Sequence, residues 1–129
     1  MIVAGLGCRS GTTAESIFFA LEAACEEAGI EPGAIAALAT GEIRREEPGI
    51  LELARKLSLP LHIVDDGAML AAEPRTKTVS RHSLSQTGSS SLSEAAALAV
   101  AGDTSELIVP RMVAYGATCA LAQAKGAAP

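Results

Sequence analysis

The sequence predicts an α/β fold: a single-domain layered fold in which helices flank a mixed, mostly parallel β-sheet. Short apolar runs alternate along the chain with segments of helical periodicity, as expected for strands joined by crossover helices. The last two apolar runs are separated by a short connection, which favours antiparallel pairing between them. The 129 residues suit one domain, and no Pro-rich or charge-rich linker divides them. We therefore assign residues 1–123 to the domain and expect 124–129 to form a loose tail.

The N-terminal elements carry start and stop signals. Residues 2–6 form a short apolar run that enters a glycine-rich turn, which indicates a buried strand. A helix is predicted over 13–29, because apolar residues recur at helical spacing until Gly29 stops them. Thr12 and Glu15 have the spacing of a capping box, so we expect Thr12 to cap this helix.

The middle of the chain repeats the alternation of strand and helix. An acidic pair before Pro48 opens the second helix, since carboxylates are stabilised at the positive end of the helix dipole and proline fits the first turn. An aspartate at position 65 or 66 is the expected N-cap of a short third helix. The elements expected here are a strand over 34–39, a helix from 46–48 that ends before Pro60, a strand over 61–64 and a short helix through Met69 and Leu70.

The C-terminal part begins with a change of composition. Polar and basic residues dominate 73–90, so we expect a mobile loop there. Ser91 and Glu94 repeat the capping-box spacing and open an Ala-rich helix that stops at Gly102. The final elements expected are strands over 107–109 and 118–121, joined by a loop that holds Pro110, Arg111, Tyr115 and Gly116.

Composition argues against several classes of function. Ten basic and fifteen acidic residues give a net charge of −5, which disfavours general nucleic-acid binding. No apolar run approaches the roughly 20 residues of a membrane span. No export signal opens the chain, so we expect a cytoplasmic protein with no membrane partner. We interpret the widely spaced cysteines as reduced thiols and expect no metal, because His62 and His82 lack suitably spaced partner ligands.

The strongest local feature is the turn Gly5-Leu6-Gly7-Cys8-Arg9-Ser10-Gly11-Thr12, which leads from the first strand into the first helix. Backbone amides at the positive end of a helix can receive phosphate or carboxylate, and Arg9 adds a planar fork for bidentate contact. The glycine spacing is one residue longer than the dinucleotide fingerprint, and the glycine and lysine of a P-loop are missing. We therefore expect no cofactor.

Three arginines mark a candidate anion-binding edge. Arg9 follows the first expected strand, Arg45 the second and Arg111 the fourth. Because the carboxyl ends of parallel strands are where ligands usually bind in an open sheet, we expect these side chains to lie together there. Cys8 is a candidate nucleophile, since a helix start and Arg9 both lower a thiol pKa. Glu94 is expected as part of a helix cap or, alternatively, as a catalytic carboxylate at the same edge.

Four stretches together resemble a known family. They are residues 5–12, residues 46–51, Gly88 followed by residues 91–97, and residues 109–111 before Thr118. In this order, and across nearly the whole chain, they resemble the CobE and CbiG C-terminal domain family of cobalamin (vitamin B12) biosynthesis. Where the family commonly carries lysine, this chain carries Arg45 and Arg111, which keep the charge but cannot serve as neutral amine bases.

The resemblance implies binding of a carboxylate-rich corrin-pathway intermediate, because such rings are edged with acetate and propionate groups. Two alternatives remain open: a precorrin hydrolase or lyase that uses Cys8 or Glu94, and a docking domain for another cobalamin-biosynthesis enzyme. In the family, CbiG opens a lactone ring with additional N-terminal sequence, so likeness to its C-terminal domain does not by itself imply hydrolysis. The expected ligand-binding residues are Gly7, Cys8, Arg9, Gly11, Thr12, Arg45, Glu47, Glu94 and Arg111.

Overall fold

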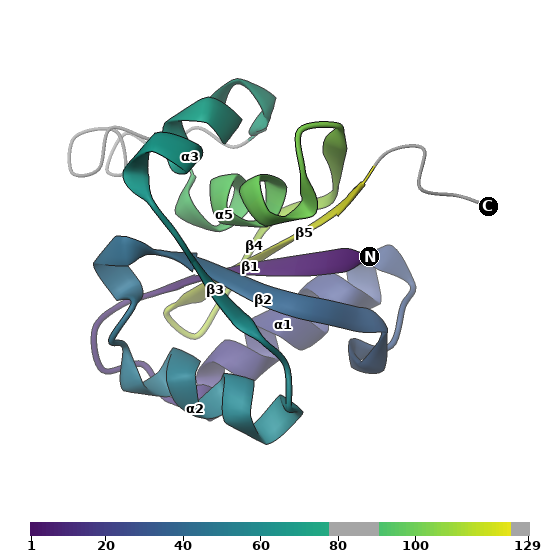
Figure 1. Cartoon of the computed structure of the whole chain (residues 1–129). Coiled ribbons are helices and arrows are strands. Elements are labelled where there is room, and N and C mark those ends of the chain that lie inside the picture. Colours follow the sequence, from purple (N-terminus) through teal and green to yellow (C-terminus); the bar gives the residue numbers. More distant parts are fainter. Residues whose placement is uncertain (78–90, 125–129) are drawn as a thin grey trace.

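The computed structural model describes residues 1–77 and 91–124, which form one five-stranded sheet with helices on both faces (Figure 1). The predicted α/β fold with a mixed sheet is confirmed. The strands are β1 (Ile2–Cys8), β2 (Ile35–Gly41), β3 (Leu61–Val64), β4 (Ser105–Ala114) and β5 (Ala117–Ala124). The described helices are α1 (Ala14–Ala28), α2 (Pro48–Leu57), α3 (Asp66–Ala72) and α5 (Leu92–Ala101), with short 3-10 helices η1 (Pro32–Ala34), η2 (Glu42–Arg44) and η3 (Glu73–Arg75).

The sheet combines parallel and antiparallel pairs in the order β3-β2-β1-β5-β4. β1, β2 and β3 pair in parallel, whereas β5 pairs antiparallel with both β1 and β4. β4 therefore runs in the same direction as β1, and β5 is the reversed strand between them. The predicted antiparallel element near the C-terminus is confirmed, and the carboxyl ends of the other strands point toward one end of the sheet.

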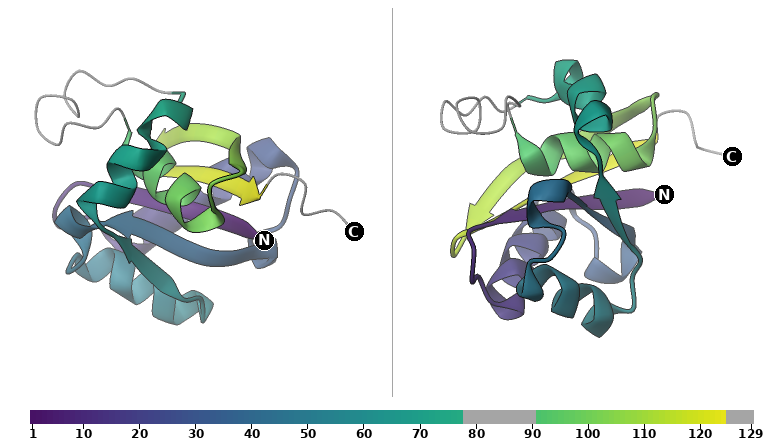
Figure 2. Two further views of the ribbon diagram at one scale, coloured as in Figure 1. Left: turned by 45° about the horizontal axis from the view of Figure 1, so that its top comes forward. Right: turned by 60° about the vertical axis from the view of Figure 1, so that its left-hand side comes forward.

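The two faces of the sheet are covered by different helices (Figures 1 and 2). α1 and α2 pack on one face over larger aliphatic side chains such as Leu6, Leu21 and Ile50. α3 and α5 pack on the other face, where alanines such as Ala96 and Ala120 dominate. Burial of this apolar surface is the main favourable contribution to folding.

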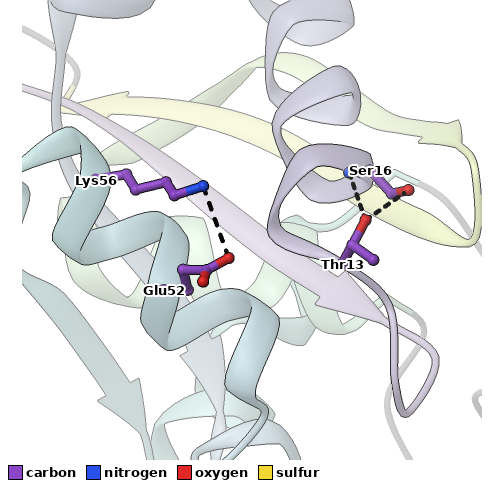
Figure 3. A network of polar contacts seen from close by, with 4 residues as sticks. All are labelled: Thr13, Ser16, Glu52 and Lys56. Carbon is purple, nitrogen blue, oxygen red and sulfur yellow. Dashed lines mark hydrogen bonds and ion pairs between the residues drawn. The ribbon is translucent and has the colours of Figure 1, made fainter.

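The first helix is capped one residue later than its sequence predicts. Thr13 caps α1, because its Oγ1 accepts a hydrogen bond of 3.1 Å from the Ser16 amide (Figure 3). The expectation that Thr12 is the cap is wrong. The Thr12 hydroxyl instead donates to the Arg9 carbonyl at 2.6 Å and so closes the preceding turn.

The other predicted helix starts are confirmed. Ser91 Oγ accepts a hydrogen bond of 3.3 Å from the Glu94 amide at the start of α5. Of the two aspartates proposed for α3, Asp65 is the cap and accepts from the Ala68 amide at 2.8 Å. Pro48 occupies the first turn of α2, as expected from its fixed backbone angle.

The β4–β5 hairpin is longer and tighter than the sequence predicts. Pro110 and Arg111, expected in a loop, lie inside β4, and Tyr115 and Gly116 alone form the turn, with φ angles of 51° and 82°. The strand accommodates the proline through register shifts on either side of Val109. Proline cannot donate to a ladder, so it is tolerated in this edge strand next to an irregularity.

Some predictions fall on residues outside the described ranges. Of the loop expected over 73–90, residues 78–90 are not described, and these include His82 and the matched Gly88. Residues 125–129 of the expected tail also lie outside, while Ala124 is the last residue of β5. In the described ranges, no helix is long and apolar enough to cross a membrane.

Candidate binding site

A cavity of about 1050 Å³ opens beyond the carboxyl ends of β2 and β3. Its longest lining segment is 41–48, which runs from the end of β2 through η2 to the start of α2. Residues of α3, Leu92 at the start of α5 and the turn at Ser10 and Gly11 complete the lining. This is the region of an open α/β sheet where ligands usually bind, and the volume is large enough for a bulky organic ligand.

The glycine-rich turn beside the cavity has most of its amides already paired. The amide of Arg9 donates to the Gly116 carbonyl and that of Thr12 to the Arg9 carbonyl, both at 3.1 Å. The Gly11 amide donates to Oε2 of Glu47 at 3.0 Å. The turn therefore does receive an anion, as its sequence predicts, but that anion is a carboxylate of the same chain.

Glu47 is best explained as a link between two helix starts. It is 7% exposed and directly precedes α2, while Gly11 lies in the turn before α1. Beside it, the backbone of Gly49 packs against the Thr12 carbonyl so closely that no Cβ fits between them. The hydrogen bond and this close contact together fix the segment 41–48 against the first turn.

Arg44 is anchored at the cavity by the end of β1. Its Nε donates to the Cys8 carbonyl at 2.6 Å, and its Nη1 lies 3.5 Å from the Ile43 carbonyl. A guanidinium carries five N–H donors, so the anchored group retains donors for a ligand. Arg45, the next residue, is exposed and lines the same cavity. Arg45 is among the ligand-binding residues expected from the sequence, whereas Arg44, its neighbour in the charged run before the second helix, is not.

The cavity also has an apolar side. Ile43 is 58% exposed and Leu70 is 57% exposed, and both line it together with the buried Met69 and the half-buried Leu92. One exposed leucine on a protein surface is ordinary, but several large apolar side chains around one cavity favour contact with an apolar ligand surface. Neither residue carries a local signal of binding, because Ile43 stands among charged residues and Leu70 lies on a short helix.

Of the three arginines expected at one edge, one lines the cavity. Arg45 lines the cavity, whereas Arg9 lies in the neighbouring turn and Arg111 lies in β4, both outside the lining. The prediction that Arg111 follows its strand is wrong. Arg111 lies outside the cavity lining because β1 and β5 separate its strand, β4, from β2 in the sheet.

Glu94 is a buried structural carboxylate in its described contacts. It has no exposed surface, and its two oxygens accept hydrogen bonds of 2.8 Å from the amides of Lys77 and Arg111. These bonds connect the start of α5 to the segment after η3 and to β4. Glu94 does not line the cavity.

The expected lowering of the Cys8 pKa is wrong. Burial of the thiol raises its pKa, and the nearby Glu47 carboxylate raises it further. Arg44 and a hydrogen bond with Thr12 act in the opposite direction but are the smaller influences. A nucleophilic cysteine needs a thiolate, so this environment works against that role.

Of the nine expected ligand-binding residues, Gly11, Arg45 and Glu47 line the cavity. Gly7, Cys8 and Thr12 belong to β1 and the turn, next to the lining but outside it. Within residues 1–77 and 91–124, no three His, Cys, Asp or Glu residues gather as a metal site. All three cysteines are free thiols, consistent with their interpretation from sequence.

Comparisons with known proteins agree with this fold and with the matched motifs. Residues 2–122 match the family described as "Cobalamin synthesis G C-terminus". "Protein CobE" from Sinorhizobium sp is 36% identical over 121 residues, which cover 94% of this chain and 79% of that protein. The crystal structure of CobE, a protein from the cobalamin (vitamin B12) biosynthetic pathway, aligns with a TM-score of 0.89 at 36% identity, covering 95% of this chain and 89% of that one.

A second crystal structure supports the same assignment. Cobalamin biosynthesis protein chiG from Agrobacterium tumefaciens aligns with a TM-score of 0.77 at 40% identity, covering 97% of this chain and 99% of that one. Likeness at this level extends over nearly the full length of both chains. The chain therefore belongs to the CobE and CbiG C-terminal family, and its role lies in cobalamin biosynthesis.

Proposed function

We propose that this protein binds a carboxylate-bearing corrin-pathway intermediate in the cavity between η2 and α3. The observation that carries the proposal is the placement of an arginine pair and exposed apolar side chains around one cavity. A corrin-type ring presents two matching surfaces, since its faces are broad and apolar while its edges carry carboxylates. Arg44 and Arg45 would receive an edge carboxylate, and Ile43 and Leu70 would contact a face.

The anchoring of Arg44 supports this division of roles. Its bond to the Cys8 carbonyl fixes the guanidinium before ligand arrives, so less side-chain entropy is lost on binding. Among the described residues, the ion pair in the structure is Lys56 with Glu52 on α2, also drawn in Figure 3, and it does not involve these arginines. Arg44 and Arg45 therefore keep their positive charge available at the cavity.

The acidic residues of the cavity restrict how a polyanion can bind. Glu42, Glu46 and Asp66 line the cavity and are exposed, so water and salt screen them, while Glu47 is held by Gly11. Carboxylates placed near these acids would be repelled. The favoured ligand turns one carboxylate edge toward the arginines and its apolar face toward α3.

Binding is supported better than catalysis. Cys8 has a raised pKa, and both oxygens of Glu94 accept backbone hydrogen bonds away from the cavity. Neither group presents a reactive form to a ligand at Arg45. We therefore propose a protein that holds an intermediate or passes it between enzymes.

The test is a titration with a panel of corrin-pathway intermediates, followed by calorimetry and by absorbance over time. The expected result is binding without spectral conversion, weakened about tenfold by Arg45→Ala, since charged hydrogen bonds contribute about 1.5–3 kcal/mol. Arg55→Ala is the matched control, because Arg55 is exposed on α2 and outside the cavity lining. Equal effects of the two substitutions would refute this site, and conversion of the intermediate would establish an enzyme instead.

A further inference from the structure

The exposed aromatic side chains lie on a surface distinct from the cavity. The chain contains two Phe, one Tyr and no Trp. Phe19 on α1 and Tyr115 in the β4–β5 turn form a tilted pair with ring centroids 5.4 Å apart. Phe19 is still 43% exposed and Tyr115 is 74% exposed, and neither lines the cavity. Two of the three aromatic residues therefore keep a large part of their surface in contact with solvent.

The backbone at Tyr115 adds an independent observation. Its φ of 51° lies in the left-handed region, which bulky side chains disfavour. Two-residue hairpin turns of this kind usually carry Asn or Gly at the first position, which Tyr115 occupies here, and Gly at the second. Local stability thus favours a different residue here, and strained residues of this kind concentrate at functional surfaces.

An acidic stripe on α1 flanks Phe19 on the same face of the helix. Glu15, Phe19, Glu22 and Glu26 are all exposed, and at about 100° per residue they fall within about 60° of one another around the helix. α1 contains no basic residue, and the ion pair described in the structure lies on α2. We define the docking surface as these four residues together with Tyr115.

We propose that this docking surface binds a basic segment of another protein, which presents arginine or lysine beside apolar side chains. The charge complementarity sets the occupant. A second copy using the same face would place three glutamates opposite three glutamates, so a symmetric dimer through this surface is disfavoured. When a partner covers them, Phe19 and Tyr115 would form the desolvated centre that protein interfaces favour. The surrounding acids would form a polar rim that favours a positively charged partner.

The probe is a short synthetic amphipathic peptide with Arg and Leu on one face, titrated into the whole isotope-labelled protein and followed by NMR. Two matched peptides replace Arg by Glu or Leu by Ser. The expected result is that only the Arg/Leu peptide binds and that it shifts the signals of Phe19, Glu22 and Tyr115. Equal binding of the Arg/Ser peptide would show charge attraction alone and would overturn the proposal.

Variants separate a docking surface from a structural contact. Tyr115→Asn is expected to weaken binding of the Arg/Leu peptide about tenfold, while Asn suits the turn and preserves the fold. Val113→Ser is the control, because Val113 is 66% exposed on the same hairpin while its neighbours Met112 and Ala114 pack toward α1. Equal loss of peptide binding in both variants would overturn the proposal. It would also be overturned if the protein self-associated and Tyr115→Asn abolished that self-association.

Discussion

The two faces of the sheet are packed in different ways. On the face covered by α1 and α2, Leu and Ile form the largest group of buried side chains, beside several alanines, and these large groups fill the space between helix and sheet. On the face covered by α3 and α5, most of the buried residues are alanines. There the backbone of α5 approaches β1 so closely that Gly5 has no room for a Cβ beside the Ser93 carbonyl.

This difference affects the candidate site. Large side chains tolerate small shifts of a helix, because their rotamers adjust, whereas a helix resting on glycine and alanine is fixed by backbone contact. The close approach of α5 sets the position of Leu92 in the cavity lining and of Glu94 at the amides of Lys77 and Arg111. The first face therefore supplies most of the large apolar burial, and the second face determines where the N-terminus of α5 lies.

The largest expected effect comes from adding a methyl group to the close-packed face. Gly5→Ala should destabilise the fold by about 4 kcal/mol, because the new Cβ meets backbone atoms of α5 that cannot rotate away. Chemical denaturation followed by circular dichroism measures the change. Gly33→Ala is the control, since no atom lies within 4 Å of its Cβ position. A small effect at Gly5 would mean that α5 is not held by backbone contact.

The opposite substitution tests the face with large side chains. Leu21→Ala should destabilise the fold by about 3 kcal/mol, because Leu21 is fully buried in α1 and its removal leaves a cavity. The exposed Leu51→Ala on α2 should cost well under half as much, since Leu51 is 40% exposed. Similar losses for both leucines in thermal and chemical unfolding would contradict the packing described for this face.

The buried carboxylate tests the polar contacts of α5. Glu94→Gln should destabilise the fold by about 2 kcal/mol, because an amide offers one acceptor oxygen to the two backbone N–H groups that Glu94 now binds. Hydrogen exchange should show the loss of protection at the amides of Lys77 and Arg111. The exposed Glu106→Gln on β4 is the control and should change stability little.

Helix capping gives a smaller effect on the other face. Thr13→Ala should cost about 1 kcal/mol, since it removes the acceptor for the Ser16 amide at the start of α1. Unfolding measurements on Thr13→Ala and Thr12→Ala separate the observed cap from the one that the sequence suggests. If the Thr12 variant alone frayed the first turn of α1, the assignment of Thr13 would be incorrect.

The smallest effect concerns Cys8, which lies at the end of β1 and packs against the buried cluster on the α1 and α2 face. At neutral pH its alkylation should be slower than that of an unstructured cysteine and should rise with pH, because burial and Glu47 raise its pKa. Glu47→Gln removes a negative charge, lowers the pKa and should speed alkylation about threefold. Glu46→Gln is the control, since Glu46 is not among the groups that shift this pKa.

Local signals predicted most elements well, and their failures have physical causes. Gly29 and Ser91 mark helix ends through bonds to residues three or four positions away, so short-range sequence was sufficient. Thr12 and Thr13 are adjacent hydroxyls, and only the path of the preceding turn decides which of them becomes the cap. Pro110 suggested a loop, yet an edge strand with a register shift accommodates it.

The sequence alone determined the α/β order of elements, the family and the presence of cations at Arg45 and in the first turn. It did not determine which groups meet, because the decisive contacts join positions far apart in the chain. Gly11 with Glu47 and Cys8 with Arg44 are each separated by 36 residues, and both depend on α2 packing beside α1. Tertiary structure therefore decided that the turn holds the chain's own carboxylate, and that the arginines of the proposed binding site lie along the segment after β2.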